Sequence, residues 1–279
     1  MQGITVRGAV ALITGASSGI GWATAKALAE AGARVIAADI DERGLERLMR
    51  EAWAREAGVE TVVLDVTDGH AFAQLAQRLA AEGRLPTILV NNAGVCHLGS
   101  VFDTTPETLR RVMEVNLLGV LNACSAFGPR MVAAARPGRI VNVAALAAVA
   151  PPPNMSAFAA SKAGVVAISE ALAQELSATQ VGVSCIFPGE VSTPSVRTRL
   201  AIGRSMSNEH VDRVQNYYQR EGAHPDVVAR SILRSLREGR ACAYPGRRAG
   251  FVSLMQRVLP SGAFRDFTRR HAREVGYLA

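Results

Sequence analysis

The sequence has few aromatic residues and no cluster of metal-binding side chains. Phe, Trp and Tyr make up 5% of the 279 residues, and no nucleic-acid motif accompanies the arginines. The cysteines are scattered singly, with no CxxC pair and no His at metal-ligand spacing. We therefore expect no nucleic-acid partner, no metal site and no disulfide. The residues interpreted as buried free thiols are Cys96, Cys124, Cys185 and Cys242.

Long apolar runs are also missing. No stretch approaches the roughly 18 uninterrupted apolar residues of a membrane span, and the N-terminus has neither a charged n-region nor a cleavage site. These absences predict a cytoplasmic protein. The net charge is +7 and the sequence pI about 9.8, with most of the excess arginine in the last third, which we interpret as a basic surface.

Short apolar runs alternate with helical patterns along most of the chain. Because both faces of the strands are apolar, the alternation predicts an α/β fold, a doubly wound parallel sheet covered by helices on each side. The predicted strands are 9–14, 34–39, 61–66, 87–90, 139–144 and 181–187, and the predicted helices 19–32, 41–58, 68–82, 106–134 and 156–178. We expect a single domain over residues 1–245, with a helical substrate lid near 194–222 and a C-terminal amphipathic extension over 246–279.

A glycine-rich turn, TGASSGIG, follows the first predicted strand. Gly15 allows a tight turn, Gly19 lets backbone N–H groups approach a pyrophosphate, and Gly21 admits close packing of the next helix. The N-terminus of that helix adds attraction for an anion. A glycine-rich turn alone is weak evidence, but its place between a strand and a helix predicts a dinucleotide site.

Asp39 lies at the end of the second predicted strand, where a carboxylate can accept hydrogen bonds from the adenosine ribose. It would repel a 2′-phosphate, and the following Ile40 offers no compensating charge, so the pair favours NAD over NADP. Asp41 is better placed than Asp39 to cap the following helix. Asp65 ends the third predicted strand and could reach the adenine amino group.

Taken in order, these motifs resemble the short-chain dehydrogenase/reductase family over roughly residues 5–245. The resemblance is carried by TGASSGIG, Asp39, Asp65-Val66, NNAG (91–94), Asn116, Lys162 and PGEVST (188–193). It implies a Rossmann-type fold and an NAD(H)-dependent oxidoreductase that interconverts an alcohol and a carbonyl. It also implies a homodimer or homotetramer, with subunit contacts through the helices over 106–134 and 156–178.

The same resemblance implies which residues bind the cofactor. Val191 and Thr193 would hold the nicotinamide carboxamide, and NNAG would steady the central sheet and border the adenosine ribose. The implied cofactor-binding residues are Thr14, Gly15, Ser17, Ser18, Gly19, Ile20, Gly21, Asp39, Ile40, Asp65, Val66, Asn92, Ala93, Gly94, Lys162, Pro188, Gly189, Val191 and Thr193.

The family's chemistry uses a Ser, a Tyr and a Lys, supported by an Asn, and this sequence departs from it at two of the four positions. Asn116 and Lys162 are present, but Phe158 stands one helical turn before Lys162 at the Tyr position and Ala145 stands at the Ser position. The chain as written should therefore be nearly inactive in the family's usual reaction, because a positioned proton donor contributes roughly 10²–10⁴ in rate.

Three explanations stay open. The two residues could be engineered Ser→Ala and Tyr→Phe changes. They could belong to a natural variant that uses another acid or performs non-redox chemistry. The chain could also be a cofactor-binding pseudoenzyme that acts by interaction. His97, Tyr217 and Tyr218 are the candidate donors for the second explanation, although an ordinary loop position for His97 and apolar packing for the tyrosines are favoured.

The segments predicted to lie near the substrate are rich in apolar residues. The lid mixes aliphatic residues with two tyrosines, which suits a small hydrophobic alcohol or carbonyl compound, although a packed helical core would explain the pattern equally well. The lid residues are Val196, Leu200, Ile202, Met206, Val211, Val214, Tyr217 and Tyr218. In the extension, packing on the domain or on a sister subunit is favoured over contact with a membrane surface. Its apolar stripe is Phe251, Leu254, Met255, Val258 and Leu259.

Overall fold

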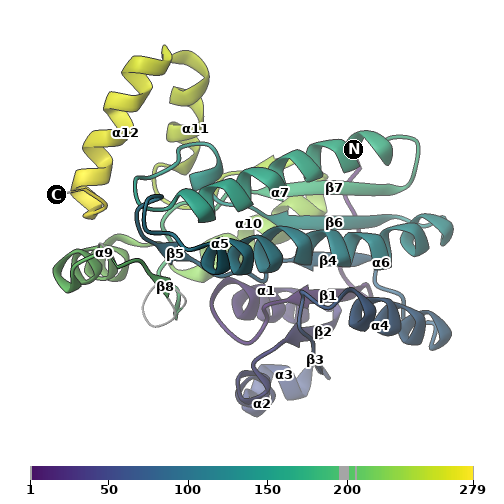
Figure 1. Cartoon of the computed structure of the whole chain (residues 1–279). Helices are drawn as coiled ribbons and strands as arrows, with labels where there is room; N and C mark the ends of the chain where they lie inside the picture. The colour runs from purple at the N-terminus through teal and green to yellow at the C-terminus, as the bar shows by residue number, and fades with distance from the viewer. Residues whose placement is uncertain (1, 195–200, 205, 279) are drawn as a thin grey trace.

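The computed structural model describes residues 2–194, 201–204 and 206–278. A parallel sheet of seven strands forms the centre, in the order β3-β2-β1-β4-β6-β7-β9 (Figure 1). Its strands are β1 (Val10–Thr14), β2 (Arg34–Asp39), β3 (Glu60–Val63), β4 (Ile88–Asn91), β6 (Gly138–Val143), β7 (Val181–Ile186) and β9 (Cys242–Ala243). Two short strands, β5 (His97–Leu98) and β8 (Ala201–Ile202), pair separately.

Helices cover both faces of the sheet, which confirms the predicted doubly wound α/β fold in one domain. One face carries α1 (Gly19–Glu30), α2 (Glu42–Arg50), α3 (Ala52–Glu56) and α10 (Pro225–Glu238). The other carries α4 (Gly69–Ala81), α6 (Gly119–Ala133) and α7 (Ser156–Glu175). The helix α5 (Pro106–Met113) runs into α6 through a π-helical turn, η1 (Glu114–Leu118), and a short 3₁₀ helix, η2 (Leu146–Ala148), follows β6.

Alternation along the strands divides the core in two. Ala11 and Ile13 of β1 belong to the cluster under α1 and α10, whereas Leu12 belongs to the cluster under α4 and α6. Successive side chains of a strand point to opposite faces, so apolar residues at consecutive positions bury both faces of the sheet.

Two predicted elements differ clearly from the observed ones. The third strand ends at Val63 instead of residue 66, because Asp65 Oδ1 accepts hydrogen bonds from Thr67 N (2.9 Å) and Thr67 Oγ1 (2.8 Å) and so forms a turn. The predicted helix over 41–58 is split at Glu51, whose ψ of 138° is extended. Asp41 caps α2 by accepting a hydrogen bond from Gly44 N at 3.0 Å, as predicted.

The described parts of the lid and of the C-terminal extension contain the helices α9 (Asn208–Glu221), α11 (Ala249–Val258) and α12 (Ser261–Val275). They stand at the end of the molecule where the sheet strands finish (Figure 1). Two lid residues named above, Val196 and Leu200, lie outside the described residues. Val211 and Val214 of α9 pack with Ala272, Val275 and Tyr277 of the extension in a small separate core.

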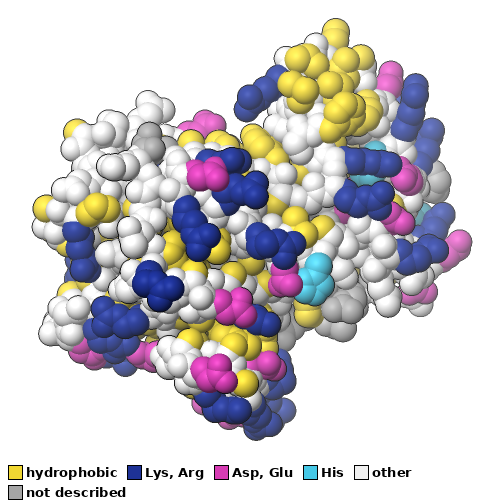
Figure 2. All heavy atoms as spheres, turned by 180° about the vertical axis from the view of Figure 1, so that it is seen from behind, with side chains coloured by type: hydrophobic (Ala, Val, Ile, Leu, Met, Phe, Trp, Pro, Cys, Tyr) yellow, Lys and Arg dark blue, Asp and Glu magenta, His cyan; other side chains and the backbone are white. Residues whose placement is uncertain are grey.

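The extension thus packs on the domain, but through a different face from the predicted apolar stripe. Phe251, Leu254 and Val258 are exposed, and Figure 2 shows hydrophobic side chains gathered on this protruding end of the molecule. Phe251 packs edge-on against Phe267, with ring centroids 6.0 Å apart. Contact of this face with a sister subunit stays a prediction.

Two further expectations are corrected. Cys124 and Cys185 are buried free thiols as predicted, but Cys96 is only partly buried and Cys242, on the edge strand β9, is exposed. His97 is not an ordinary loop residue, since it is buried in β5, whose register pairs it with Ala201.

Within the described residues, α7 alone is long and apolar enough to cross a membrane by length and composition, with a mean hydropathy of 1.2. It lies against β7 and η1 and carries the buried Lys162. Its length and hydropathy therefore suit a cover helix of the sheet equally well.

Candidate active site

The glycine turn between β1 and α1 is shaped so tightly that side chains cannot replace its glycines. Gly15 and Gly19 have positive φ values of 67° and 54°. A Cβ at Gly21 would lie 2.0 Å from Gly15 O and 2.6 Å from Asn92 Nδ2. Because no side chains fill the turn, Gly15, Gly19 and Gly21 form a cradle at the N-terminus of α1. Backbone N–H groups there can bind an anion.

The side chains of Asn92 and Thr14 form hydrogen bonds that hold this turn. Asn92 Nδ2 donates to the carbonyl oxygens of Thr14 (2.9 Å) and Gly15 (3.1 Å). Thr14 Oγ1 accepts hydrogen bonds from Asn92 N (3.0 Å) and Ala93 N (3.1 Å). Thr14, Ser17 and Gly21 were predicted to bind the cofactor but do not line the cavity described below, so their binding role stays a prediction.

Asp39 is buried at the end of β2 and connects it to the same turn. Its Oδ2 accepts a hydrogen bond from Ser17 N at 2.9 Å, and its Oδ1 accepts one from Asp41 N at 3.0 Å. The carboxylate also lines the cavity beside Ile40, which is 57% exposed. Sequence reasoning predicted its place at the ribose end, but it did not foresee this bond to the glycine turn.

A single cavity of about 350 Å³ continues from the glycine turn to the lid and the extension. It brings together most of the predicted cofactor residues with Ala145, Phe158 and Lys162. The predicted residues that line it are Gly15, Ser18, Gly19, Ile20, Asp39, Ile40, Asp65, Val66, Asn92, Ala93, Gly94, Ala145, Phe158, Lys162, Pro188, Gly189, Val191 and Thr193.

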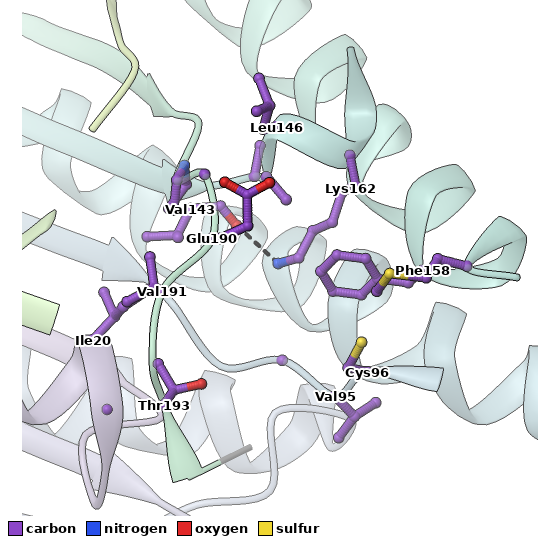
Figure 3. A pocket seen from close by; sticks show the side chains of 18 of the residues that line it. Ile20, Val95, Cys96, Val143, Leu146, Phe158, Lys162, Glu190, Val191 and Thr193 are labelled. Carbon is purple, nitrogen blue, oxygen red and sulfur yellow. Dashed lines mark hydrogen bonds between the residues drawn. The ribbon is translucent and has the colours of Figure 1, made fainter. Parts of the chain in front are cut away.

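Lys162 and Phe158 lie one turn apart on α7 and face this cavity (Figure 3). Lys162 Nζ donates to Val143 O at 2.8 Å. Desolvation by burial lowers the pKa of Lys162 from 10.5 to about 8. Its ammonium thus carries a charge that an electron-rich ligand hydroxyl could stabilise.

Asn116 does not line the cavity, but its hydrogen bonds lead to Val95 and Phe158, which do. It lies in the π-helical turn η1, where the wider backbone ring is often found near functional sites. Its side chain exchanges two hydrogen bonds with Val95, accepting from N at 2.8 Å and donating to O at 2.9 Å. It also donates to Ser161 Oγ at 3.0 Å, which in turn donates to Phe158 O at 2.7 Å.

The substrate end of the cavity is closed by residues distant in sequence. Tyr218 of α9 and Tyr277, just after α12, both line it, and their hydroxyl oxygens lie 2.7 Å apart. Asn154 Nδ2 donates to Tyr277 O at 2.8 Å and so ties the chain end to the loop before α7. Of the candidate donors named from the sequence, Tyr218 is in the cavity wall, whereas His97 and Tyr217 are not.

Sequence reasoning missed a polar pair in the same wall. Glu190 Oε1 lies 2.8 Å from His271 Nε2. Glu190 lies inside PGEVST, between the predicted cofactor residues Gly189 and Val191, and this position is the one signal in the sequence; no motif marks His271. No cluster of three or more His, Cys, Asp or Glu side chains in the described part of the chain could hold a metal ion.

A family model described as short chain dehydrogenase matches residues 9–201. The chain therefore belongs to the short-chain dehydrogenase/reductase family, a class of oxidoreductases.

Among curated relatives, it is 37% identical over 252 residues to the probable oxidoreductase EphD of Mycobacterium tuberculosis, covering 89% of this chain and 43% of that protein. It thus spans less than half of that relative's length. It is 30% identical over 263 residues to the C alpha-dehydrogenase of Sphingobium sp., covering 91% of this chain and 86% of that protein.

Solved structures of similar proteins contain either dinucleotide. A short-chain dehydrogenase/reductase from Burkholderia phymatum in complex with NAD matches with a TM-score of 0.79 and 30% identity, over 91% of this chain and 94% of that one. A metagenomic short-chain oxidoreductase in complex with NADP matches with a TM-score of 0.68 and 31% identity, over 84% of this chain and 93% of that one.

Proposed function

We propose that this protein is an NAD(H)-dependent oxidoreductase that interconverts an alcohol and a carbonyl group on a small hydrophobic molecule, with Ala145 and Phe158 at the family's catalytic Ser and Tyr positions. The observation that carries the proposal is the arrangement on α7. Phe158 and Lys162 face one cavity that runs on to the glycine turn and Asp39.

The residues present fit a bound dinucleotide. The cradle at Gly15, Gly19 and Gly21 would receive the pyrophosphate, because an added Cβ at these positions would occupy it or clash with the turn. When bound, the dinucleotide supplies or accepts the hydride. Lys162 would contact its nicotinamide ribose, and Val191 and Thr193 would lie beside the carboxamide, as the family resemblance implies.

NAD is the form that the ribose end favours. The carboxylate of Asp39 lies there, and the neighbouring Ile40 carries no charge. Among the cavity-lining side chains that the structure describes, the basic ones are Arg111, Lys162 and His271, and none of them comes from β2 or the glycine turn. A 2′-phosphate would therefore meet an anion without a partnering guanidinium.

An apolar substrate fits the far end of the cavity. The lid, the extension and the loop before α7 contribute mainly hydrocarbon surface there, which rewards burial of an apolar ligand. The apolar lining residues at this end include Leu98, Met155, Val214, Val252, Phe267 and Ala272.

The chain as written is expected to be slow in this reaction. Phe158 and Ala145 have no proton to donate, and loss of a general acid costs roughly 10²–10⁴ in rate. Binding of the dinucleotide should survive, because the glycine turn, Asp39 and Lys162 are all in place. Whether the two residues arose by engineering or by evolution does not alter this expectation.

Self-association into a dimer or tetramer is also part of the proposal. The face formed by α5, η1 and α6 exposes Leu109, Leu118 and Leu121, and α7, which contacts α5, exposes alanines next to it. Exposed aliphatic side chains on adjacent helices are typical of an interface between subunits.

The test restores both hydroxyls. In Ala145→Ser with Phe158→Tyr, NADH-dependent reduction of acetophenone, cyclohexanone and 2-octanone should rise by at least about 100-fold over the original chain. Ala160→Ser on the exposed face of α7 and Phe102→Tyr, at a 98% exposed position, are the matched controls. No gain on a ketone that demonstrably binds would favour non-redox chemistry or a pseudoenzyme instead.

A further inference from the structure

Glu190 and His271 meet in the wall of the cavity although they are 81 positions apart in the sequence. Glu190 follows β7 in the segment that carries Val191 and Thr193, and His271 comes from α12 in the C-terminal extension. Both line the same cavity as Phe158 and Lys162, and Figure 3 shows the Glu190 side chain among the residues around that cavity. The pair therefore lies at the junction of the cofactor segment and the substrate wall.

The pair is shielded but still connected to solvent. The side chain of Glu190 is 16% exposed and that of His271 is 25% exposed. On its other side, His271 Nδ1 lies 3.3 Å from the more exposed Glu274 Oε2, which also pairs with Arg248 at 3.3 Å. One imidazole edge thus faces the cavity carboxylate and the other faces a carboxylate at the surface.

The charges around His271 favour its protonated form. Its pKa is raised above 6.5, first by the hydrogen bond with Glu190 and then by Glu274, and partial burial opposes the rise. The ring of Tyr217 on α9 packs edge-on against it at 6.1 Å. A protonated imidazole held between a buried and an exposed carboxylate can move protons between solvent and the cavity.

We propose that Glu190 is the general acid and base that sustains the slow reaction of this chain in place of the two missing hydroxyls, exchanging a proton with the substrate oxygen, and that His271 is the positioning and relay residue that supplies Glu190 from solvent. The inference rests on the proposed oxidoreductase function. It identifies a proton donor in a site where Phe158 and Ala145 cannot serve as one.

For reduction, the imidazolium of His271 first passes its proton to the Glu190 carboxylate. The carbonyl carbon then gains the hydride, the π pair of the C=O bond moves to oxygen, and that oxygen takes the proton from Glu190, which becomes a carboxylate again. The neutral imidazole of His271 recovers a proton from solvent. Oxidation of an alcohol follows the same path in reverse, with the Glu190 carboxylate as base.

The other acidic groups in the wall are poorly suited to this task. Burial raises the pKa of both Tyr218 and Tyr277 above the usual value of 10, and their hydroxyls are engaged with each other. Burial also raises the pKa of Cys96 to about 12. Lys162 is the main rival, since its pKa is lowered to about 8, but its Nζ is bound to Val143 O.

The experiment compares Glu190→Gln and His271→Gln with the original chain. The matched control is Asp266→Asn, which removes a carboxylate from a 68% exposed side chain on the same helix as His271. The rate of NADH oxidation with acetophenone is measured in single turnover, and NADH affinity is measured separately by fluorescence titration. Glu190→Gln should lower the rate by about 100-fold with less than about twofold change in NADH affinity.

His271→Gln should lower the rate about tenfold, a smaller loss because water can partly replace the relay. It should also change the pH profile. In the original chain the reduction rate should fall as pH rises through the pKa of His271, because the relay loses its proton. That fall should disappear in His271→Gln and persist in Asp266→Asn.

A second measurement needs no cofactor. The five histidines of the chain can be followed by NMR in the free protein, with His271→Gln identifying the signal of His271. Glu190→Gln should lower the pKa of His271, since it replaces the carboxylate that favours the imidazolium, and Asp266→Asn should leave it unchanged.

The outcomes separate the two proposals. Unchanged turnover in Glu190→Gln, absent turnover in the original chain, or an unchanged pKa of His271 in Glu190→Gln would each overturn the role of the pair. If Ala145→Ser with Phe158→Tyr is nevertheless active, the proposed oxidoreductase function stands and only this inference fails. If that double variant is also inactive on ketones that bind, the function itself fails.

Discussion

Asn92 Nδ2 donates a hydrogen bond to the carbonyl oxygen of Gly15 at 3.1 Å, in the turn that leads into α1. The same bond crosses from the loop after β4 to the loop after β1, two strands that are neighbours in the sheet. The shape of the glycine turn is therefore set by a side chain from another strand, and a residue that disturbs this contact should disturb the whole cradle.

Gly21→Ala is expected to weaken both folding and dinucleotide binding. Its Cβ would lie 2.0 Å from Gly15 O and 2.6 Å from Asn92 Nδ2, so the turn or the helix must move. We expect a loss of about 1–3 kcal/mol in the free energy of unfolding and at least a tenfold weaker NADH affinity. Urea denaturation and fluorescence titration measure the two effects.

Gly128→Ala is the matched control, because nothing lies within 4 Å of a Cβ at that position in α6. It should be neutral or stabilise the helix by up to about 1 kcal/mol. Equal behaviour of the two variants would contradict the packing role assigned to Gly21.

Cofactor preference should depend on the two residues at the end of β2. The original chain should bind NADH more tightly than NADPH, because Asp39 is anionic and Ile40 is neutral. Asp39→Ser with Ile40→Arg should reverse the preference by adding a guanidinium and removing the repelling charge. Paired fluorescence titrations with both dinucleotides check this, and Ile40→Gln is the uncharged control. Tighter binding of NADPH by the original chain would refute the assignment to NAD.

Lys162 should destabilise the free protein at neutral pH. Its pKa is about 8 in the folded state against an ordinary value of 10.5, so between these pH values the unfolded chain binds more protons. Stability should therefore rise with pH across that window. Lys162→Met removes the buried charge and should stabilise the free protein at pH 7 by at most about 3 kcal/mol.

The gain from Lys162→Met should shrink as the pH approaches 10, while NADH affinity falls at every pH. Urea denaturation at pH 7 and pH 10 gives the first quantity. Lys26→Met, at an exposed position on α1, is the control and should show no such dependence. A pH-independent gain would mean that the ammonium is not desolvated in the folded protein.

Mutations that remove the paired hydroxyls of Tyr218 and Tyr277 should have non-additive effects on the free energy of unfolding. Either single Tyr→Phe change leaves the other hydroxyl without this 2.7 Å partner, at a cost of about 1–3 kcal/mol. The double Tyr→Phe variant leaves no orphaned hydroxyl, so it should be more stable than either single variant. Denaturation of all four proteins completes the cycle, with Tyr244→Phe as a control in which the ring still stacks on Phe187. Additive losses would contradict the direct bond.

Much of the fold follows from local pattern. The alternation of apolar runs and amphipathic segments predicted six of the seven strands and the covering helices up to α7, because burial on both faces leaves a clear signature in each strand. It did not predict α10 or the short edge strand β9. The errors lie where a polar side chain overrides the pattern. Asp65 turns the chain two residues after the strand has ended, and Glu51 interrupts an otherwise continuous helical pattern.

The two halves of the site differ in how far the sequence predicts them. The cofactor half depends on short motifs with fixed spacing, so Asp39 and the glycine turn could be located in advance. The contact of Glu190 with His271 depends on how α12 folds back over the domain, which no local pattern specifies. His97 illustrates the same limit, since its strand β5 pairs with β8, more than a hundred residues further along the chain.

The wall formed by Val252, Phe267 and Tyr277 has an evolutionary consequence. The residues proposed to bind the dinucleotide all precede position 194, whereas these three wall residues follow it. Recombination near that boundary could exchange one terminal segment for another and so change which molecules are accepted, while the machinery for electron transfer is inherited intact.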